Sequence, residues 1–187
     1  MLLAVLTFQP TVPVYAACRA WRAATDVNGI QIGMNGTGRA ILGRWDAPDY
    51  PRPESDEPSA EPTFVRFATR DGREELRLVH YPGAVVDDYD ALEVRRPAGG
   101  TSPGKRLPFA QFATERGIRL GMTERDLVAL LGACFTRERK GDAALLTYRI
   151  ADKAHPALKR SGMPAYEATY EFRNGLLARF ALGFEMP

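Results

Sequence analysis

Apolar and polar residues alternate over residues 166–172 and again over residues 176–184, and this pattern constrains the fold more than any other feature of the chain. Alternation of this kind is typical of strands with one buried face, and the Asn-Gly pair between the two stretches is a hairpin signal. A three-residue turn at 173–175 sets Phe172 opposite Leu176 and keeps the apolar side chains on one face. We therefore predict an antiparallel hairpin with a three-residue turn.

A short, well-capped helix is predicted before this hairpin. Thr123 opens the pattern Thr-Glu-Arg-Asp, in which Asp126 stands at the third helical position and can complete a capping box. Leu127 begins a set of leucines at helical spacing, and Gly132 can end the helix. Together with a further strand at 145–150, these elements predict an α+β fold in which a helix packs on an antiparallel β-sheet.

The first half of the chain carries a second hairpin signal, the Asp-Gly pair at 71–72. Alternating stretches at 63–70 and 73–81 flank it, and a further strand is expected after residue 88. A two-residue type I′ turn would pair Val65 with Leu78 and give the hairpin one apolar face. We expect a β-rich unit here.

Two segments rich in proline or glycine divide the chain. Residues 46–62 are proline-rich and acidic, and residues 97–104 contain two prolines and three glycines. Residues 30–43 also echo residues 118–132, so two tandem units that form one extended sheet are an alternative arrangement. The predicted parts are an N-terminal segment, a β-rich unit, a linker and an α+β unit: residues 1–19, 20–96, 97–104 and 105–187.

The N-terminal residues suggest export. An apolar stretch leads to small residues before Cys18, as in a secretory signal, although the usual basic start is absent. The alternative is an N-terminal strand at 2–8, and a cytoplasmic protein if Met1 is the mature start. Cys18 and Cys134 allow three states: a disulfide, a lipidated Cys18, or two unrelated thiols. The predicted location is the periplasm or cell envelope.

Several classes of function find no support in the sequence. The net charge is only +2 and no long basic run occurs, so nucleic-acid binding is not expected. No stretch is long and apolar enough to span a bilayer. The glycine-rich residues 33–38 lack the lysine of a phosphate loop, and Asp87–Asp90 lacks the glycine of a calcium loop. We expect no catalytic residue, no metal and no cofactor.

A family resemblance covers residues 117–183. It rests on Gly117-Ile-Arg-Leu-Gly-Met-Thr-Glu-Arg-Asp-Leu-Val-Ala-Leu-Leu-Gly132, on Leu146-Thr-Tyr148, and on the hairpin Tyr170-Glu-Phe-Arg-Asn-Gly175. These residues resemble the SmpA/OmlA domain of small outer-membrane lipoproteins of the β-barrel assembly machinery, whose fold is shared with the β-lactamase inhibitor protein. The resemblance implies export, a non-enzymatic role and binding through the exposed face of the sheet.

The predicted function is therefore a non-enzymatic, envelope-associated protein–protein interaction domain, such as an inhibitor or an assembly accessory. Tyr166, Tyr170 and Phe180 are the candidate contact aromatics, because aromatic side chains commonly anchor interfaces. One alternative is a small-molecule binder or unrecognised enzyme that uses the loop 33–38 and Asp87–Asp90. The other is a structural lipoprotein anchored at Cys18. The partner protein is not identified by the sequence.

Overall fold

The computed structural model describes residues 22–33, 38–42, 63–81 and 89–185. The predicted signal segment 1–19 and the acidic loop 46–62 therefore lie outside the described residues. Helices and strands follow one another along the chain in this order: β1 (Asp26–Val27), β2 (Ile30–Gln31), α2 (Arg39–Leu42), β3 (Thr63–Ala68), β4 (Glu75–His80), β5 (Ala91–Arg95), β6 (Lys105–Arg106), α3 (Glu124–Leu131), β7 (Thr136–Lys140), β8 (Ala143–Ile150), α4 (Pro156–Ser161), β9 (Ala165–Arg173) and β10 (Leu176–Glu185).

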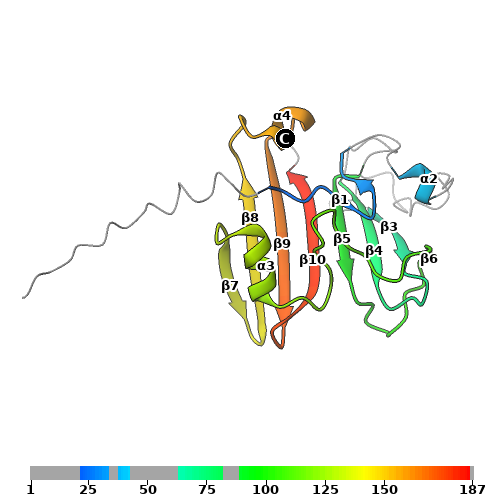
Figure 1. Cartoon of the computed structure of the whole chain (residues 1–187). Coiled ribbons are helices and arrows are strands. Elements are labelled where there is room, and N and C mark those ends of the chain that lie inside the picture. The colour runs from blue at the N-terminus through cyan, green and yellow to red at the C-terminus, as the bar shows by residue number, and fades with distance from the viewer. Residues whose placement is uncertain (1–21, 34–37, 43–62, 82–88, 186–187) are drawn as a thin grey trace, which may run out of the picture.

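Eight of these strands form one sheet in the order β6-β3-β4-β5-β10-β9-β8-β7 (Figure 1). Neighbouring strands are antiparallel except β3 and β6, which run parallel, so the sheet is mixed. β10, the last strand along the chain, lies between β5 and β9. It therefore joins the strands of the first half of the chain to those of the second.

The predicted register of the first hairpin is confirmed, but its turn type is wrong. Val65 pairs with Leu78, as the alternation indicates. Gly72 has φ of 77°, whereas Asp71 is not among the residues with positive φ, which a type I′ turn would require. Instead, Gly72 N donates to Thr69 O at 2.9 Å, and the Asp71 side chain accepts from the Thr69 hydroxyl at 2.8 Å.

The three-residue turn predicted for the second hairpin is wrong. Arg173 pairs with Leu176, which leaves only Asn174 and Gly175 in the turn. Both have positive φ, 51° and 75°, as a two-residue type I′ turn requires. Asparagine is one of the few residues other than glycine that tolerates this conformation.

A β-bulge reconciles this shorter turn with the apolar pattern. Leu177 pairs with Phe172, and the next pair joins Arg179 to Glu171, so that Ala178 is an additional residue in β10. After the bulge, Phe180 faces Tyr170, and both are buried. The extra residue thus lies in the strand, whereas the sequence pattern was equally consistent with an extra residue in the turn.

The predicted helix is present as α3. Thr123 is its N-cap: its hydroxyl accepts from Asp126 N, and the Asp126 side chain accepts from Thr123 N, which completes the capping box. Leu127 and Leu131 are its buried residues, and Gly132 follows as the C-cap. Local sequence signals therefore locate this element correctly.

The predicted α+β fold class is nevertheless wrong, because the protein is mainly β, with one large mixed sheet and short helices. An eight-residue helix is about 12 Å long, whereas eight strands span about 33 Å, so α3 covers only part of the sheet (Figure 1). The sequence similarity between residues 30–43 and 118–132 does not correspond to two similar structural units either. In the first stretch, α2 has four residues, half the length of α3.

Irregular segments complete the cover of the core. Buried residues of 107–120 and of the N-terminal segment 24–32 belong to the same hydrophobic cluster as the inner residues of β3 to β10. The N-terminal segment is anchored on both halves of the sheet, since Tyr166 donates to Ala24 O and Gly33 N donates to Tyr89 O at 2.9 Å. Because such segments have no regular periodicity, the sequence pattern does not reveal them.

Candidate functional site

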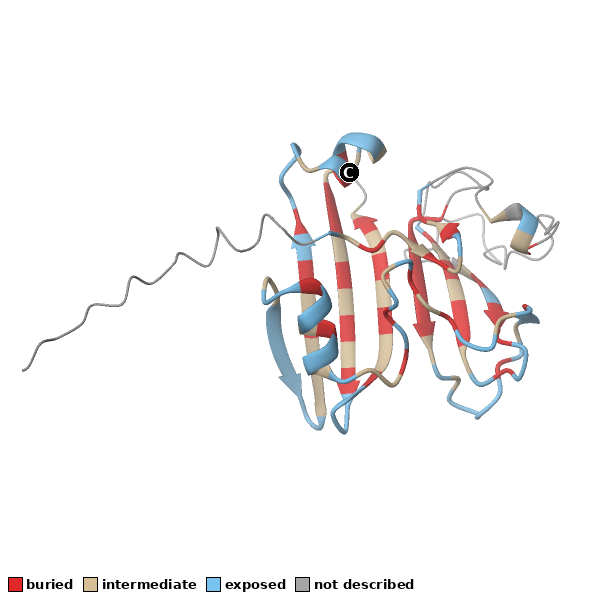
Figure 2. Ribbon diagram, in the orientation of Figure 1, coloured by how far each residue is buried: buried red, intermediate tan, exposed pale blue. Residues whose placement is uncertain are grey.

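One face of the sheet carries the core, and the other carries mainly charged side chains. Burial alternates along the strands, as Figure 2 shows. On β5, for example, Leu92 and Val94 are fully buried in the core cluster, and Glu93 between them points to the opposite face. We call this opposite face the open face. Its central residues come from β4, β5, β9 and β10.

Glu93 is the centre of an ion-pair network on the open face. Its Oε2 lies 2.7 Å from Arg179 Nη2, and its Oε1 lies 3.8 Å from Arg77 Nη1 and 3.7 Å from Arg95 Nη1. The register explains this arrangement, since Arg77 is the direct partner of Glu93 on the neighbouring strand. The Glu93 side chain is only 11% exposed, so its charge is stabilised chiefly by these arginines.

The network continues at the far end of β4, where the predicted linker packs against the sheet. Ser102 is buried, and its hydroxyl donates to Glu75 Oε2 at 2.7 Å, while Arg77 Nε donates to Glu75 Oε1 at 2.7 Å. Burial alone would raise the pKa of Glu75, but these two hydrogen bonds and the positive charges of Arg77 and Arg66 together outweigh it and lower the pKa. Ser102 therefore stabilises the Glu75 carboxylate.

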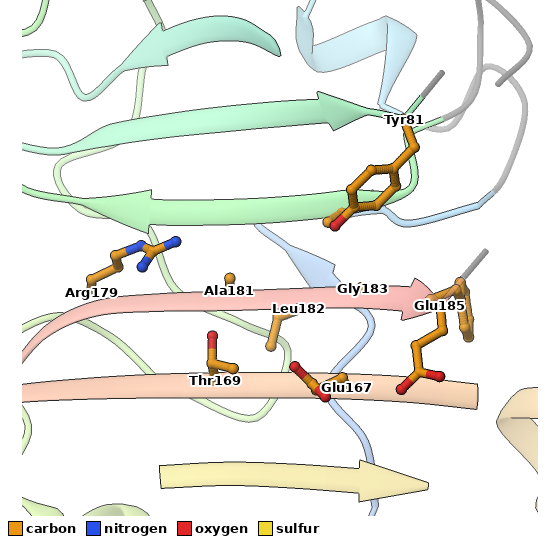
Figure 3. A pocket seen from close by; sticks show the side chains of 10 residues that line it. Tyr81, Glu167, Thr169, Arg179, Ala181, Leu182, Gly183 and Glu185 are labelled. Atoms are coloured by element: carbon orange, nitrogen blue, oxygen red, sulfur yellow. The ribbon is translucent and has the colours of Figure 1, made fainter. Parts of the chain in front are cut away.

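A hollow of about 700 Å³ lies over β5, β10 and β9 on the open face (Figure 3). The hollow is deep here because its floor consists of small residues: Ala181 and Gly183 on β10, and Ala91, which pairs with Gly183, on β5. A Cβ on Gly183 would lie 2.8 Å from Ala91 Cβ, so only glycine permits this close approach. Tyr81, whose side chain is among the exposed large hydrophobics at 37%, stands at one end.

Charged side chains of Glu167 and Glu185 also line this first hollow. Arg149 donates to both carboxylate oxygens of Glu185, at 2.6 and 2.9 Å, and these hydrogen bonds lower the pKa of that carboxyl. Burial raises the pKa of the Tyr81 phenol, with a further contribution from the negative charge of Asp90. At neutral pH this end of the open face thus presents carboxylates and a protonated phenol.

A second hollow, of about 370 Å³, adjoins the first and shares Arg179 with it. It lies at the bulge, since Ala178 is among its lining residues. The full lining is Arg95, Arg96, Glu171, Arg173, Ala178 and Arg179. We call it the arginine hollow. Because Arg179 lines both, the two hollows lie next to each other, and together they are called the groove, with carboxylates toward one end and arginines at the other.

The predicted contact aromatics are not on this surface. Tyr166, Tyr170 and Phe180 are each 0% exposed and belong to the core cluster, so the prediction that they anchor a partner is wrong. Alternation identifies which residues share a face, but not which of the two faces other segments cover. The aromatic face is the one that α3 and the N-terminal segment cover.

Other predicted site residues have mixed outcomes. Cys134 is disulfide-bonded, while Cys18 lies outside the described residues, so their pairing stays a prediction. Of the glycine-rich loop 33–38, residues 34–37 lie outside the described part, as do Asp87 and Asp88. Asp90 is buried and accepts from Tyr81 N at 2.7 Å, which places it in a structural role at the ends of β4 and β5.

Across residues 22–33, 38–42, 63–81 and 89–185, the side chains of His, Cys, Asp and Glu form no group of three or more that could hold a metal ion. In the same part of the chain, no helix has the length and apolar character that crossing a bilayer requires. The chain matches no protein-family model, no curated protein and no solved structure. The resemblance to the SmpA/OmlA domain therefore stays a prediction.

Proposed function

We propose that this chain is a non-enzymatic protein-binding domain that contacts its partner through the groove on the open face. The observation that carries this proposal is the groove itself, two adjoining hollows over β5, β9 and β10 lined by small residues and by charged side chains. Interfaces commonly combine such a central depression with surrounding polar residues. The family resemblance points to the same use of the sheet.

The dimensions of the groove suit a segment of another protein. Ala178 and Glu185, which line its two ends, are seven residues apart on β10, or about 23 Å at 3.3 Å per residue. An extended segment of about seven residues has the same length. A loop or strand of a partner can therefore lie along the groove and place side chains against Gly183 and Ala181.

The electrostatics favour binding over acid–base chemistry. Glu75 and Glu185 both have a lowered pKa because neighbouring groups donate hydrogen bonds to them, so both are acceptors at neutral pH. Charges of both signs on one surface give a partner a defined orientation. We include in the proposal the envelope location that the N-terminal residues and the family resemblance imply.

A photo-crosslinking experiment tests the proposal. A photoreactive residue replaces Thr169, which lines the groove, and a matched protein carries it at Ala154, an exposed loop residue outside the groove. In the native host we expect one discrete protein adduct from position 169 and none from position 154. Adding Ala181→Arg fills the groove and should abolish the adduct. An adduct that survives this substitution, or that forms equally from position 154, would show that the groove is not the contact surface.

A further inference from the structure

The arginine hollow exists because of the bulge in β10. Leu177 faces the core and Arg179 faces the open side, although only Ala178 lies between them. Regular alternation would place Arg179 on the core face, so the extra residue is what directs its guanidinium to the open face. The small side chain of Ala178 leaves space at this point, and Arg95, Arg96, Arg173 and Arg179 line the hollow around it.

Two carboxylates hold three of these arginines in place. Glu171 Oε1 lies 2.7 Å from Arg173 Nε, and Glu171 Oε2 lies 3.9 Å from Arg179 Nη1. Glu93 binds Arg179 and approaches Arg95 from the other side, as described above. Fixed guanidinium groups lose little conformational entropy when they bind a further group, so the hollow is preorganised.

The hollow retains positive charge and donor capacity. Arg95, Arg173 and Arg179 stand against two carboxylates, Glu93 and Glu171, which leaves a net positive charge, while the fourth arginine, Arg96, interacts with Glu74. An arginine offers five N–H donors, and the ion pairs described use only a few of them. The hollow is therefore built to receive one more anion.

We propose that this anion is a carboxylate, the side chain of an aspartate or glutamate on the partner protein. Guanidinium forks match a planar carboxylate in two parallel hydrogen bonds. Glu171, which lines the hollow, would repel the second negative charge of a phosphate group more than a single charge. The inference rests on the proposed function, because it names the chemistry by which the partner enters one end of the groove.

The test uses a small probe and does not need the partner. N-acetyl-glutamate amide is titrated into the ¹⁵N-labelled protein while the arginine Nε–Hε resonances are recorded, and N-acetyl-glutamine amide is the neutral control. We expect saturable shifts of Arg95, Arg173 and Arg179 with the acidic probe only. Equal shifts with the neutral probe, or no saturable shift, would overturn the inference. Tighter binding of inorganic phosphate would also overturn it, in favour of a phosphate-bearing partner.

Two variants separate the hollow from general surface charge. Arg173→Ala should weaken binding of the acidic probe about tenfold, because it removes a charge-assisted hydrogen-bonding group. Arg139→Ala, at an exposed arginine on β7 outside the hollow, should change it less than twofold.

Unchanged binding in the Arg173→Ala protein would overturn the inference. The result is independent of the crosslinking at position 169. An adduct there without anion binding would refute the carboxylate alone. Anion binding without any adduct would refute the proposed function, and the carboxylate would then have no partner protein to carry it.

Discussion

The substitutions Gly183→Ala and Ala91→Gly together move one methyl group from β5 to β10. They test whether these two strands approach each other as closely as the structure shows. Gly183 and Ala91 are direct partners, and a Cβ on Gly183 would lie 2.8 Å from Ala91 Cβ and 3.1 Å from Asp90 O. Carbon atoms in favourable contact are about 3.5–4.0 Å apart. Gly183→Ala therefore forces these strands apart, whereas Ala91→Gly in the same chain removes one of the two methyl groups that clash.

The expected free energies follow from the contact. Overpacking of this kind costs about 1–3 kcal/mol, and replacing glycine within a strand returns about 0.5–1 kcal/mol, so Gly183→Ala should destabilise by roughly 1–2 kcal/mol. Ala91→Gly should cost about 1–2 kcal/mol through added flexibility and a lost buried methyl. The double variant should be less destabilised than the sum, with a coupling of about 1–2 kcal/mol. Full recovery is not expected, because the contact with Asp90 O remains.

Urea unfolding followed by far-UV circular dichroism measures all four proteins, and Gly99→Ala is a matched control. A Cβ on Gly99 meets no atom within 4 Å, and its φ is not positive, so that substitution should be neutral or slightly stabilising. Unchanged stability of Gly183→Ala would refute the close approach of the two strands. A strictly additive double variant would refute the pairing of Gly183 with Ala91.

Three further predictions concern the covered face. Thr123→Ala removes the N-cap of α3 and should cost about 1 kcal/mol in the same unfolding assay; a change below 0.3 kcal/mol, roughly the error of such comparisons, would contradict the capping role. Tyr148→Phe should destabilise the protein by about 1 kcal/mol, because the hydroxyl donates to Gly132 O at 2.7 Å. Tyr170→Phe should be neutral or stabilising, because among the described residues its buried hydroxyl has no hydrogen-bond partner. The reverse ranking of the two variants would contradict these hydrogen-bond assignments. Burial raises the pKa of both phenols, so the folded state keeps them protonated while the unfolded chain ionises above about pH 10. Stability should therefore fall as the pH rises past 10, and absorbance at 295 nm should show these tyrosines ionising together with unfolding; ionisation before any loss of circular dichroism would contradict their burial.

The sequence predicts local elements well where one signal has one structural solution. The capping box of α3 is such a case, since Thr123, Asp126 and Gly132 each fill a defined position of a helix end. The register of β3 and β4 is another, because alternation over both strands leaves only one pairing that buries Val65 with Leu78. In both cases the interactions lie within a few residues of the turn or cap.

Prediction fails where alternation leaves two solutions. The pattern around residues 174–175 requires one extra residue to align the apolar faces, and that residue can lie in the turn or in a strand. The tolerance of Asn174 for a left-handed conformation allows the short turn, and Ala178 then forms the bulge. The fold class was wrong for a related reason, because strand pairing between β5 and β10 and the irregular cover of the core have no local signal.

The candidate site was missed because its residues look ordinary in the sequence. Glu93, Arg95 and Arg179 occupy the outward positions of alternating strands, where charged residues are expected on any solvated sheet. Only the three-dimensional register brings them together, and only the bulge opens the arginine hollow. The aromatic residues, which are conspicuous in the sequence, belong instead to the core.

The central position of β10 has a consequence for how the protein folds. β5 pairs with β10 through residues 84 to 92 positions apart, from Arg179 with Arg95 to Gly183 with Ala91, whereas β3, β4 and β5 pair with close neighbours along the chain. Contacts between such distant residues form slowly. During synthesis, the edges of β5 and β9 that pair with β10 therefore stay exposed until residues 176–185 have emerged. A chain interrupted before β10 would keep both edges open, and exposed edges of this kind promote aggregation.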